Sequence, residues 1–141
     1  QKVVQRENQM RLLISIFLSA LFSTSIYVGS ASANKIWVST WTNSDGSEST
    51  TESVFYSEFK RNGQLGHYGW SNGRFMGYYI DGGKGFEGKW VQDKSGKKCK
   101  YSVDGSFYHG HVWFYTDDGR NFQGEWGYCD DDPSLIWRGA R

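Results

Sequence analysis

Hydrophobic and polar residues alternate in two copies of one five-residue pattern. Residues 86–90 read Phe-Glu-Gly-Lys-Trp and residues 122–126 read Phe-Gln-Gly-Glu-Trp, and each copy follows a turn rich in Asp and Gly. In a β-strand, this period-two alternation places Phe, Gly and Trp on one face and the two polar side chains on the other. We therefore expect two half-buried strands of an antiparallel sheet, which direct four aromatic side chains into a core: Phe86, Trp90, Phe122 and Trp126.

Turn signals divide the chain after residue 33 into eight or nine short strands, without a helix. Asn-Gly or Asp-Gly pairs favour tight hairpins because both central residues of a type I′ turn need positive φ. Such pairs begin at positions 62, 72, 81, 104 and 118. The expected strands span residues 36–41, 53–60, 64–70, 74–80, 85–91, 99–103, 106–115, 121–128 and 135–141. The polar segment 42–52 has no apolar periodicity, and we predict that it is a mobile loop.

Strands joined by hairpins form an up-and-down meander, and a meander of this length either closes into a barrel or splits into two packed sheets. Gly77, Gly88 and Gly124 stand on the aromatic face, where a missing side chain permits the strong coiling of a small barrel. The predicted fold is therefore an all-β, antiparallel, closed barrel. A two-sheet β-sandwich is the alternative.

Residues 10–33 have the pattern of a secretory signal peptide. A basic start at Met10 and Arg11 precedes an apolar run over residues 12–28, and Ala31-Ser32-Ala33 matches the small-residue cleavage pattern. We expect cleavage after Ala33, with an uncleaved membrane anchor as the alternative. Residues 1–9 carry no pattern and stay unassigned. Residues 34–141 are expected to form one secreted or periplasmic domain, without membrane association after cleavage.

Composition and charge narrow the classes of partner. All seven Trp follow residue 33, which is a large apolar content for one small domain. The chain has a formal net charge of only +1, so no strong field attracts nucleic acid, and we expect no nucleic-acid partner. In an exported chain, the two cysteines, Cys99 and Cys129, are predicted to form a disulfide rather than a metal site or reactive thiols.

The aromatic and glycine motifs together resemble the calycin-type barrels, a superfamily that includes lipocalins and avidins. The resemblance is carried by Trp37 and Trp41 on the first strand, Gly-x-Leu-Gly-x-Tyr at 63–68, the two Phe-x-Gly-x-Trp strands and the final segment from Trp137 to Arg141. In calycins a Trp of the first strand packs beneath a basic residue of the last strand. The resemblance implies that the last strand pairs with the first, that Arg141 covers Trp37 or Trp41, and that the barrel mouth is open to a ligand.

Few residues have the spacing of a metal or catalytic site. His109 and His111 share one strand face, and Asp130–Asp132 form an acidic run, but both sets lack the ligand number or spacing of a known metal centre. Four lysines, Lys94, Lys97, Lys98 and Lys100, are interpreted as a charged hairpin tip. No nucleophile elbow or phosphate-binding glycine loop is present. We expect no metal, no cofactor and no enzymatic activity.

Two binding functions agree with the surplus of aromatic residues. The first is a module that holds a saccharide or small amphipathic ligand in the barrel mouth, because Trp and Tyr combine an apolar face with a polar edge. The candidate ligand-binding residues are Trp70, Tyr78, Trp113, Tyr115 and Tyr128. The second is a protein-interaction domain, an inhibitor or adhesin, with a filled barrel and an exposed patch of Tyr78, Trp113 and Tyr115. The other aromatics are predicted to fill the core.

Overall fold

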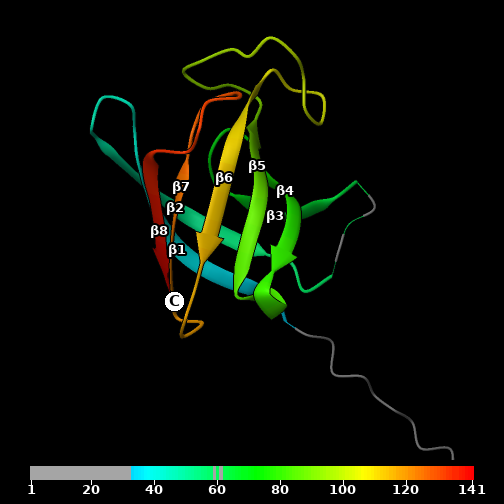
Figure 1. The fold of residues 1–141 in the computed structure, drawn as a ribbon, viewed down its shortest axis with the longest axis vertical. Coiled ribbons are helices and arrows are strands. Elements are labelled where there is room, and N and C mark those ends of the chain that lie inside the picture. The colour runs from blue at the N-terminus through cyan, green and yellow to red at the C-terminus, as the bar shows by residue number, and fades with distance from the viewer. Residues whose placement is uncertain (1–32, 59, 61) are drawn as a thin grey trace, which may run out of the picture. The chain divides into compact units, whose positions relative to one another are not determined.

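The computed structural model describes residues 33–58, 60 and 62–141, which form one eight-stranded antiparallel barrel (Figure 1). Apart from Ala33, the unassigned segment 1–9 and the predicted signal peptide lie outside the described residues. In the part of the chain that the structure describes, no helix is long and apolar enough to cross a membrane.

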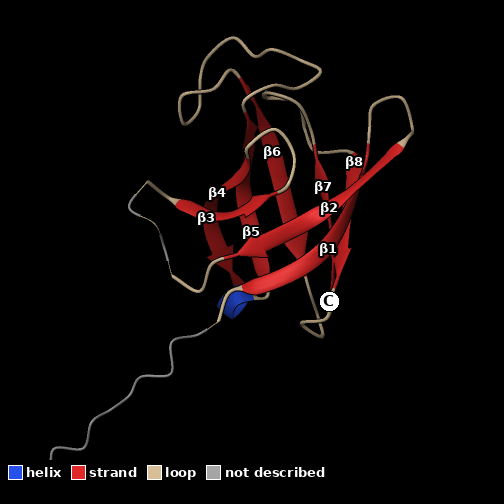
Figure 2. Cartoon of the chain, turned by 180° about the vertical axis from the view of Figure 1, so that it is seen from behind, coloured by secondary structure: helices blue, strands red, loops and turns tan. Residues whose placement is uncertain are grey.

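Every strand pairs with its neighbour in the sequence, and β8 pairs with β1, as both views of the ribbon show (Figure 1, Figure 2). The strands are β1 (Lys35–Thr42), β2 (Glu48–Phe55), β3 (Gln64–Tyr68), β4 (Gly73–Ile80), β5 (Gly85–Gln92), β6 (Tyr108–Tyr115), β7 (Asn121–Trp126) and β8 (Leu135–Ala140), with a short 3-10 turn, η1 (Asp81–Gly83), between β4 and β5. The up-and-down barrel expected from the hairpin signals and from the calycin resemblance is confirmed, and the two sheets of a sandwich are not formed.

The first and last strands close the barrel. Their register runs from Val38 opposite Ala140 to Trp41 opposite Trp137. Beyond β8, the Arg141 guanidinium carbon lies 5.0 Å from the centroid of the Trp37 ring. This contact between a first-strand Trp and a basic residue of the last strand is the one that the resemblance implies, with Trp37 as the partner. A cation–π contact of this kind contributes about 0.5 to 2 kcal/mol.

The inward and outward faces of the repeated pattern are as predicted. Phe86, Trp90, Phe122 and Trp126 are all buried, with 5% or less of their surface exposed. The polar residues between them point outward and are exposed or half-buried: Glu87, Lys89, Gln123 and Glu125. The aromatics Trp37, Trp41 and Trp137 join this core, so the barrel interior consists mainly of rings that meet edge to face or tilted.

The predicted mobile loop at 42–52 is wrong in its second half, because β2 begins at Glu48 and ends at Phe55 instead of spanning 53–60. This strand has few apolar residues, but its hydroxyls find partners across the pair with β1. Ser39 Oγ and Ser53 Oγ, both fully buried, share a hydrogen bond of 2.6 Å, and Thr40 and Thr50 share one of 2.9 Å on the outside. Paired hydroxyls remove the cost of burying polar groups, so a strand forms without apolar alternation.

The predicted strand at 99–103 is also not formed. These residues belong to the long connection 93–107 between β5 and β6. One bridge, between Val103 and Ser106, is the only strand-like pairing in this connection. The Tyr101 carbonyl instead accepts a hydrogen bond of 2.8 Å from His109 Nε2 on β6, so the connection packs against the outer face of the barrel.

Two glycines allow β4 and β5 to approach closely. Gly77 stands opposite Gly88, and a Cβ atom placed on Gly88 would lie 2.0 Å from the Met76 carbonyl oxygen. No side chain fits at that distance, so glycine is required where the sheet coils tightly.

Replacement of Trp90 by Ala tests the inward face of the pattern. Trp90 is 2% exposed, so its truncation is expected to lower the free energy of unfolding by about 3 to 5 kcal/mol. The matched control is Trp113→Ala, a tryptophan 38% exposed on the outer face, for which a loss of about 1 kcal/mol or less is expected. Chemical denaturation of both variants measures the difference, and equal losses would contradict the assigned faces.

Candidate binding site at one end of the barrel

A large cavity opens at the end of the barrel where β1, β3, β5 and β7 finish. It has a volume of about 650 Å³, and we call it the Trp mouth. Six aromatic residues line it: Trp41, Trp70, Trp90, Trp126, Tyr128 and Trp137. The polar side chains in its lining are Asn43, Ser71, Gln92, Lys94 and Ser95. A volume of this size is typical of sites that enclose a small molecule, and aromatic walls with a few polar groups are their usual lining.

The aromatic residues form two groups on the walls of the Trp mouth. In one group, the Trp41 ring lies 6.0 Å from Trp70 and 5.2 Å from Trp137, centroid to centroid. In the other group, Trp126 lies 5.6 Å from Trp90 and 4.9 Å from Tyr128. Most of these contacts are edge to face, so the rings hold one another in fixed orientations.

Trp70 stands at the rim of the mouth. It is 52% exposed and lies in the tight turn between β3 and β4, where Ser71 and Asn72 both have positive φ. Positive φ at two successive residues is the signature of a type I′ turn, which holds the preceding residue in a defined position. The turn therefore fixes the backbone of Trp70 at the rim of the mouth.

The indole N–H groups in the Trp mouth differ in their partners. Trp41 Nε1 donates to Asn43 Oδ1 at 2.9 Å, and Trp90 Nε1 donates to the Gly127 carbonyl at 2.9 Å. The Nε1 atoms of Trp126 and Trp137 are buried, and neither has a hydrogen-bond partner among the described residues. A buried donor without a partner costs about 1 to 3 kcal/mol, which a bound acceptor removes. Both nitrogens are shielded in this structure, so a ligand reaches either of them only if the ring turns.

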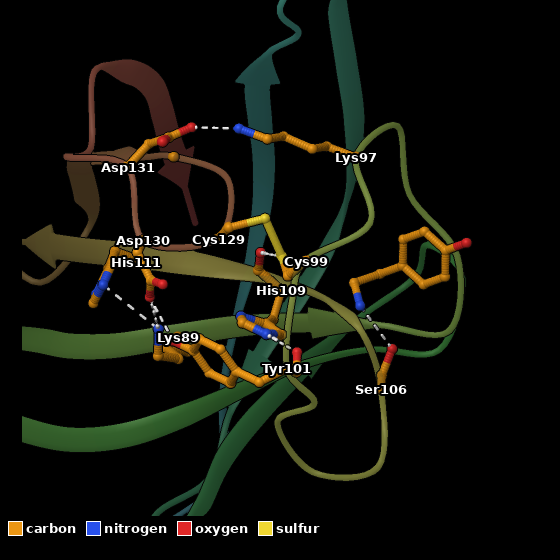
Figure 3. The surroundings of a disulfide bond; sticks show 12 residues. Lys89, Lys97, Cys99, Tyr101, Ser106, His109, His111, Cys129, Asp130 and Asp131 are labelled. Carbon is orange, nitrogen blue, oxygen red and sulfur yellow. Dashed lines mark hydrogen bonds and ion pairs between the residues drawn. A yellow bond between two sulfur atoms is a disulfide. The ribbon is translucent and has the colours of Figure 1, made fainter.

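A disulfide fixes the loops beside the mouth, and Figure 3 shows its surroundings. The predicted bond between Cys99 and Cys129 is present, with Cα atoms 5.4 Å apart. It joins the connection 93–107, which supplies Lys94 and Ser95 to the lining, to the connection after β7, which supplies Tyr128. The disulfide therefore holds two lining segments together.

Polar contacts reinforce this junction. Lys97 Nζ lies 2.8 Å from an Asp131 carboxylate oxygen, and the Tyr101 hydroxyl donates to Asp130 (Figure 3). The hydrogen bond between Tyr101 and Asp130 raises the pKa of the tyrosine and lowers the pKa of the carboxyl group. All four side chains are largely exposed, so these contacts orient the loops more than they stabilise the fold.

The two histidines on β6 share the outer face but have different surroundings (Figure 3). His109 is fully buried beneath the 93–107 connection and donates to the Tyr101 carbonyl. His111 lies 3.5 Å from Lys89 Nζ. Across the described residues, no three His, Cys, Asp or Glu side chains come together in a group that could hold a metal ion, the run Asp130–Asp132 included.

The predicted ligand-binding residues lie in three places. Trp70 and Tyr128 line the Trp mouth. Tyr115 lines a smaller cavity of about 220 Å³ at the opposite end of the barrel. Tyr78 and Trp113 lie on the outer face, 53% and 38% exposed.

Most residues of the lining were not among the candidates for binding, including four tryptophans and one lysine. Trp41, Trp90, Trp126 and Trp137 are core residues that also form the walls of the mouth, and Lys94 belongs to the predicted charged tip. Each of the first three occupies an inward position near the end of its strand, at the same end of the barrel. Inward-facing aromatics near strand ends that meet at one end of a barrel are the sequence signal that could have pointed to this cavity.

Comparisons with protein-family models, with curated proteins and with solved structures found no match to this chain.

Removal of the disulfide tests the junction beside the mouth. The two cysteines are 30 residues apart, and the double replacement Cys99→Ser/Cys129→Ser is expected to lower the free energy of unfolding by about 3 to 4 kcal/mol in the chain-entropy model. Chemical denaturation measures this loss. Thiol titration of the native protein is expected to find no reactive thiol, and two reactive thiols under non-reducing conditions would contradict the bond.

Proposed function

We propose that this protein is an exported binding protein that holds a saccharide or small amphipathic ligand in the Trp mouth, without catalysis. The observation that carries the proposal is a cavity of about 650 Å³ walled by five Trp and one Tyr, in which two buried indole N–H groups have no partner among the described residues. The C–H faces of a sugar pack on aromatic rings, and its oxygens accept hydrogen bonds from groups at the ring edges.

Two further features support the proposal. Among the described residues that line the Trp mouth, none is Asp, Glu, His or Cys, so neither a carboxylate pair nor a Ser–His pair can be assembled from them. Export is supported by the disulfide, which persists in oxidising compartments, and by the signal-peptide pattern of residues 10–33. Taken together, these two observations support a secreted or periplasmic location.

A second candidate function rests on the outer face of the barrel. Tyr78, Trp113 and Ile136 occupy one cross-strand row over β4 to β8, alternating with Glu87 and Glu125. All three apolar side chains are substantially exposed. Exposed aromatics in a row are typical of protein-binding surfaces, so a secreted inhibitor or adhesin is the alternative.

The replacement Trp70→Ala separates the two candidates. The exposed rim ring is expected to contribute to ligand binding but little to the core, so its loss should weaken glycan binding about 10-fold, which corresponds to about 1.4 kcal/mol. A glycan array identifies ligands, and calorimetry measures their dissociation constants. The control Trp113→Ala, on the outer face, should leave the affinity unchanged.

Two outcomes would contradict the proposed function. One is an array and calorimetry that detect no ligand for the native protein. The other is a ligand whose affinity depends on Trp113 and not on Trp70, which would favour the outer row and the protein-interaction alternative.

A further inference from the structure

The hydrogen-bonding groups of the Trp mouth whose role is fixed by their chemistry are donors. An indole N–H can only donate, and those of Trp126 and Trp137 have no partner among the described residues. The Asn43 amide is already engaged, because its oxygen accepts from Trp41 and its nitrogen donates to Ser47 and Ser49. The walls of the mouth therefore contain two unpaired donors, which a turn of either ring would bring to acceptors on a ligand.

The Trp mouth also carries a positive charge, which attracts acceptors on a ligand as the N–H donors do. Lys94 is the one lining residue, among those described, that is charged at neutral pH. The hydrogen bond from its backbone N–H to Ser71 Oγ, 3.0 Å long, fixes the position of the residue at the rim. The neighbouring carboxylate, Asp93, lies 3.4 Å from Arg74.

Among the described residues, Lys94 has no carboxylate partner, whereas two other lysines near the disulfide have one. Lys97 is paired with Asp131 and Lys89 lies 3.9 Å from Asp130. No carboxylate of the described residues is within salt-bridge distance of Lys94 Nζ. The Lys94 ammonium is thus an uncompensated positive charge beside an aromatic cavity.

We propose that the ligand of the Trp mouth is a carboxylate-bearing saccharide, such as a uronic acid oligomer. This inference rests on the proposed function and specifies its ligand class. In this arrangement Lys94 binds the carboxylate at the rim, where charge-assisted hydrogen bonds are the stronger kind. The Trp126 and Trp137 rings turn so that their N–H groups, shielded in the free protein, donate to hydroxyl or ring oxygens, and the sugar face packs on Trp70.

The same observations disfavour two other ligand classes. Aromatic cages bind quaternary ammonium groups by cation–π attraction, but here Lys94 repels a cation, and none of the described residues that line the mouth is acidic. A fatty acid places its single polar group at one end, so its chain would leave the two indole N–H groups unpaired. Those donors are buried, 4% and 2% exposed at Trp126 and Trp137, whereas Lys94 is exposed at the rim. Donors at both depths fit a ligand with oxygens along its length.

Calorimetry with digalacturonic acid and its dimethyl ester tests this inference, because the ester has the same ring and no charge. The acid is expected to bind about 10-fold more tightly than the ester, and its affinity is expected to fall as salt screens the exposed Lys94. The replacement Lys94→Gln should lower the affinity of the acid to that of the ester and leave the affinity of the ester unchanged. The control Lys100→Gln, an exposed lysine of the same connection that does not line the mouth, should leave both affinities unchanged.

The indole donors are tested by Trp126→Phe and Trp137→Phe, which keep a ring and remove the N–H. Each is expected to weaken acid and ester by similar factors. Trp126 and Trp137 are buried, so either Phe variant could fail to fold. Lys94 is exposed, and Lys94→Gln then still decides the test.

The outcomes separate this inference from the proposed function. Equal binding of acid and ester, or Trp70-dependent binding of neutral glycans or of choline in place of the acid, overturns the acidic ligand and leaves the Trp mouth as a binding site. No binding of any acidic or neutral glycan overturns the saccharide proposal as well.

Discussion

The pairing of β1 with β8 is the constraint on which the rest of the structure depends. It turns a meander of hairpins into a barrel without a free edge, so the inward residues of all eight strands face one common interior. The same pairing places Trp41 opposite Trp137, which form one wall of the Trp mouth, and brings Arg141 over Trp37 at the other end. Closure therefore positions both ends of the barrel at once.

The barrel interior has a filled middle and a cavity toward each end. Phe75, Leu65 and Val112 fill the middle and are almost completely buried, whereas the cavities lie toward the two ends. Tryptophan suits the end with the larger cavity because one ring is large enough to pack against the core and still contribute to a cavity wall. The stability of the core and the shape of the cavity then depend on the same residues, and the disulfide supplies stability from outside the cavity.

Most of the fold could be predicted from the sequence, because period-two alternation and Asn-Gly or Asp-Gly turns act locally. The first part of β2, residues 48–52, was predicted as a loop because it is polar, and the pairing of Thr50 with Thr40 appears only when the strands are aligned. The site was predicted in part. Alternation shows that Trp90 and Trp126 point inward. It does not show that they lie at the same position along the barrel axis as Trp70, because that position depends on register and on the tilt of the strands.

Indole N–H resonances test the account most directly, because each of the seven Trp has one. In nitrogen–proton correlation spectra recorded during titration with digalacturonic acid, the account predicts that the signals of Trp126 and Trp137 shift most, as their free donors gain an acceptor. The signal of Trp113, on the outer face, should stay unchanged. Shifts confined to Trp113, or to Trp37 at the opposite end of the barrel, would contradict a binding site in the Trp mouth.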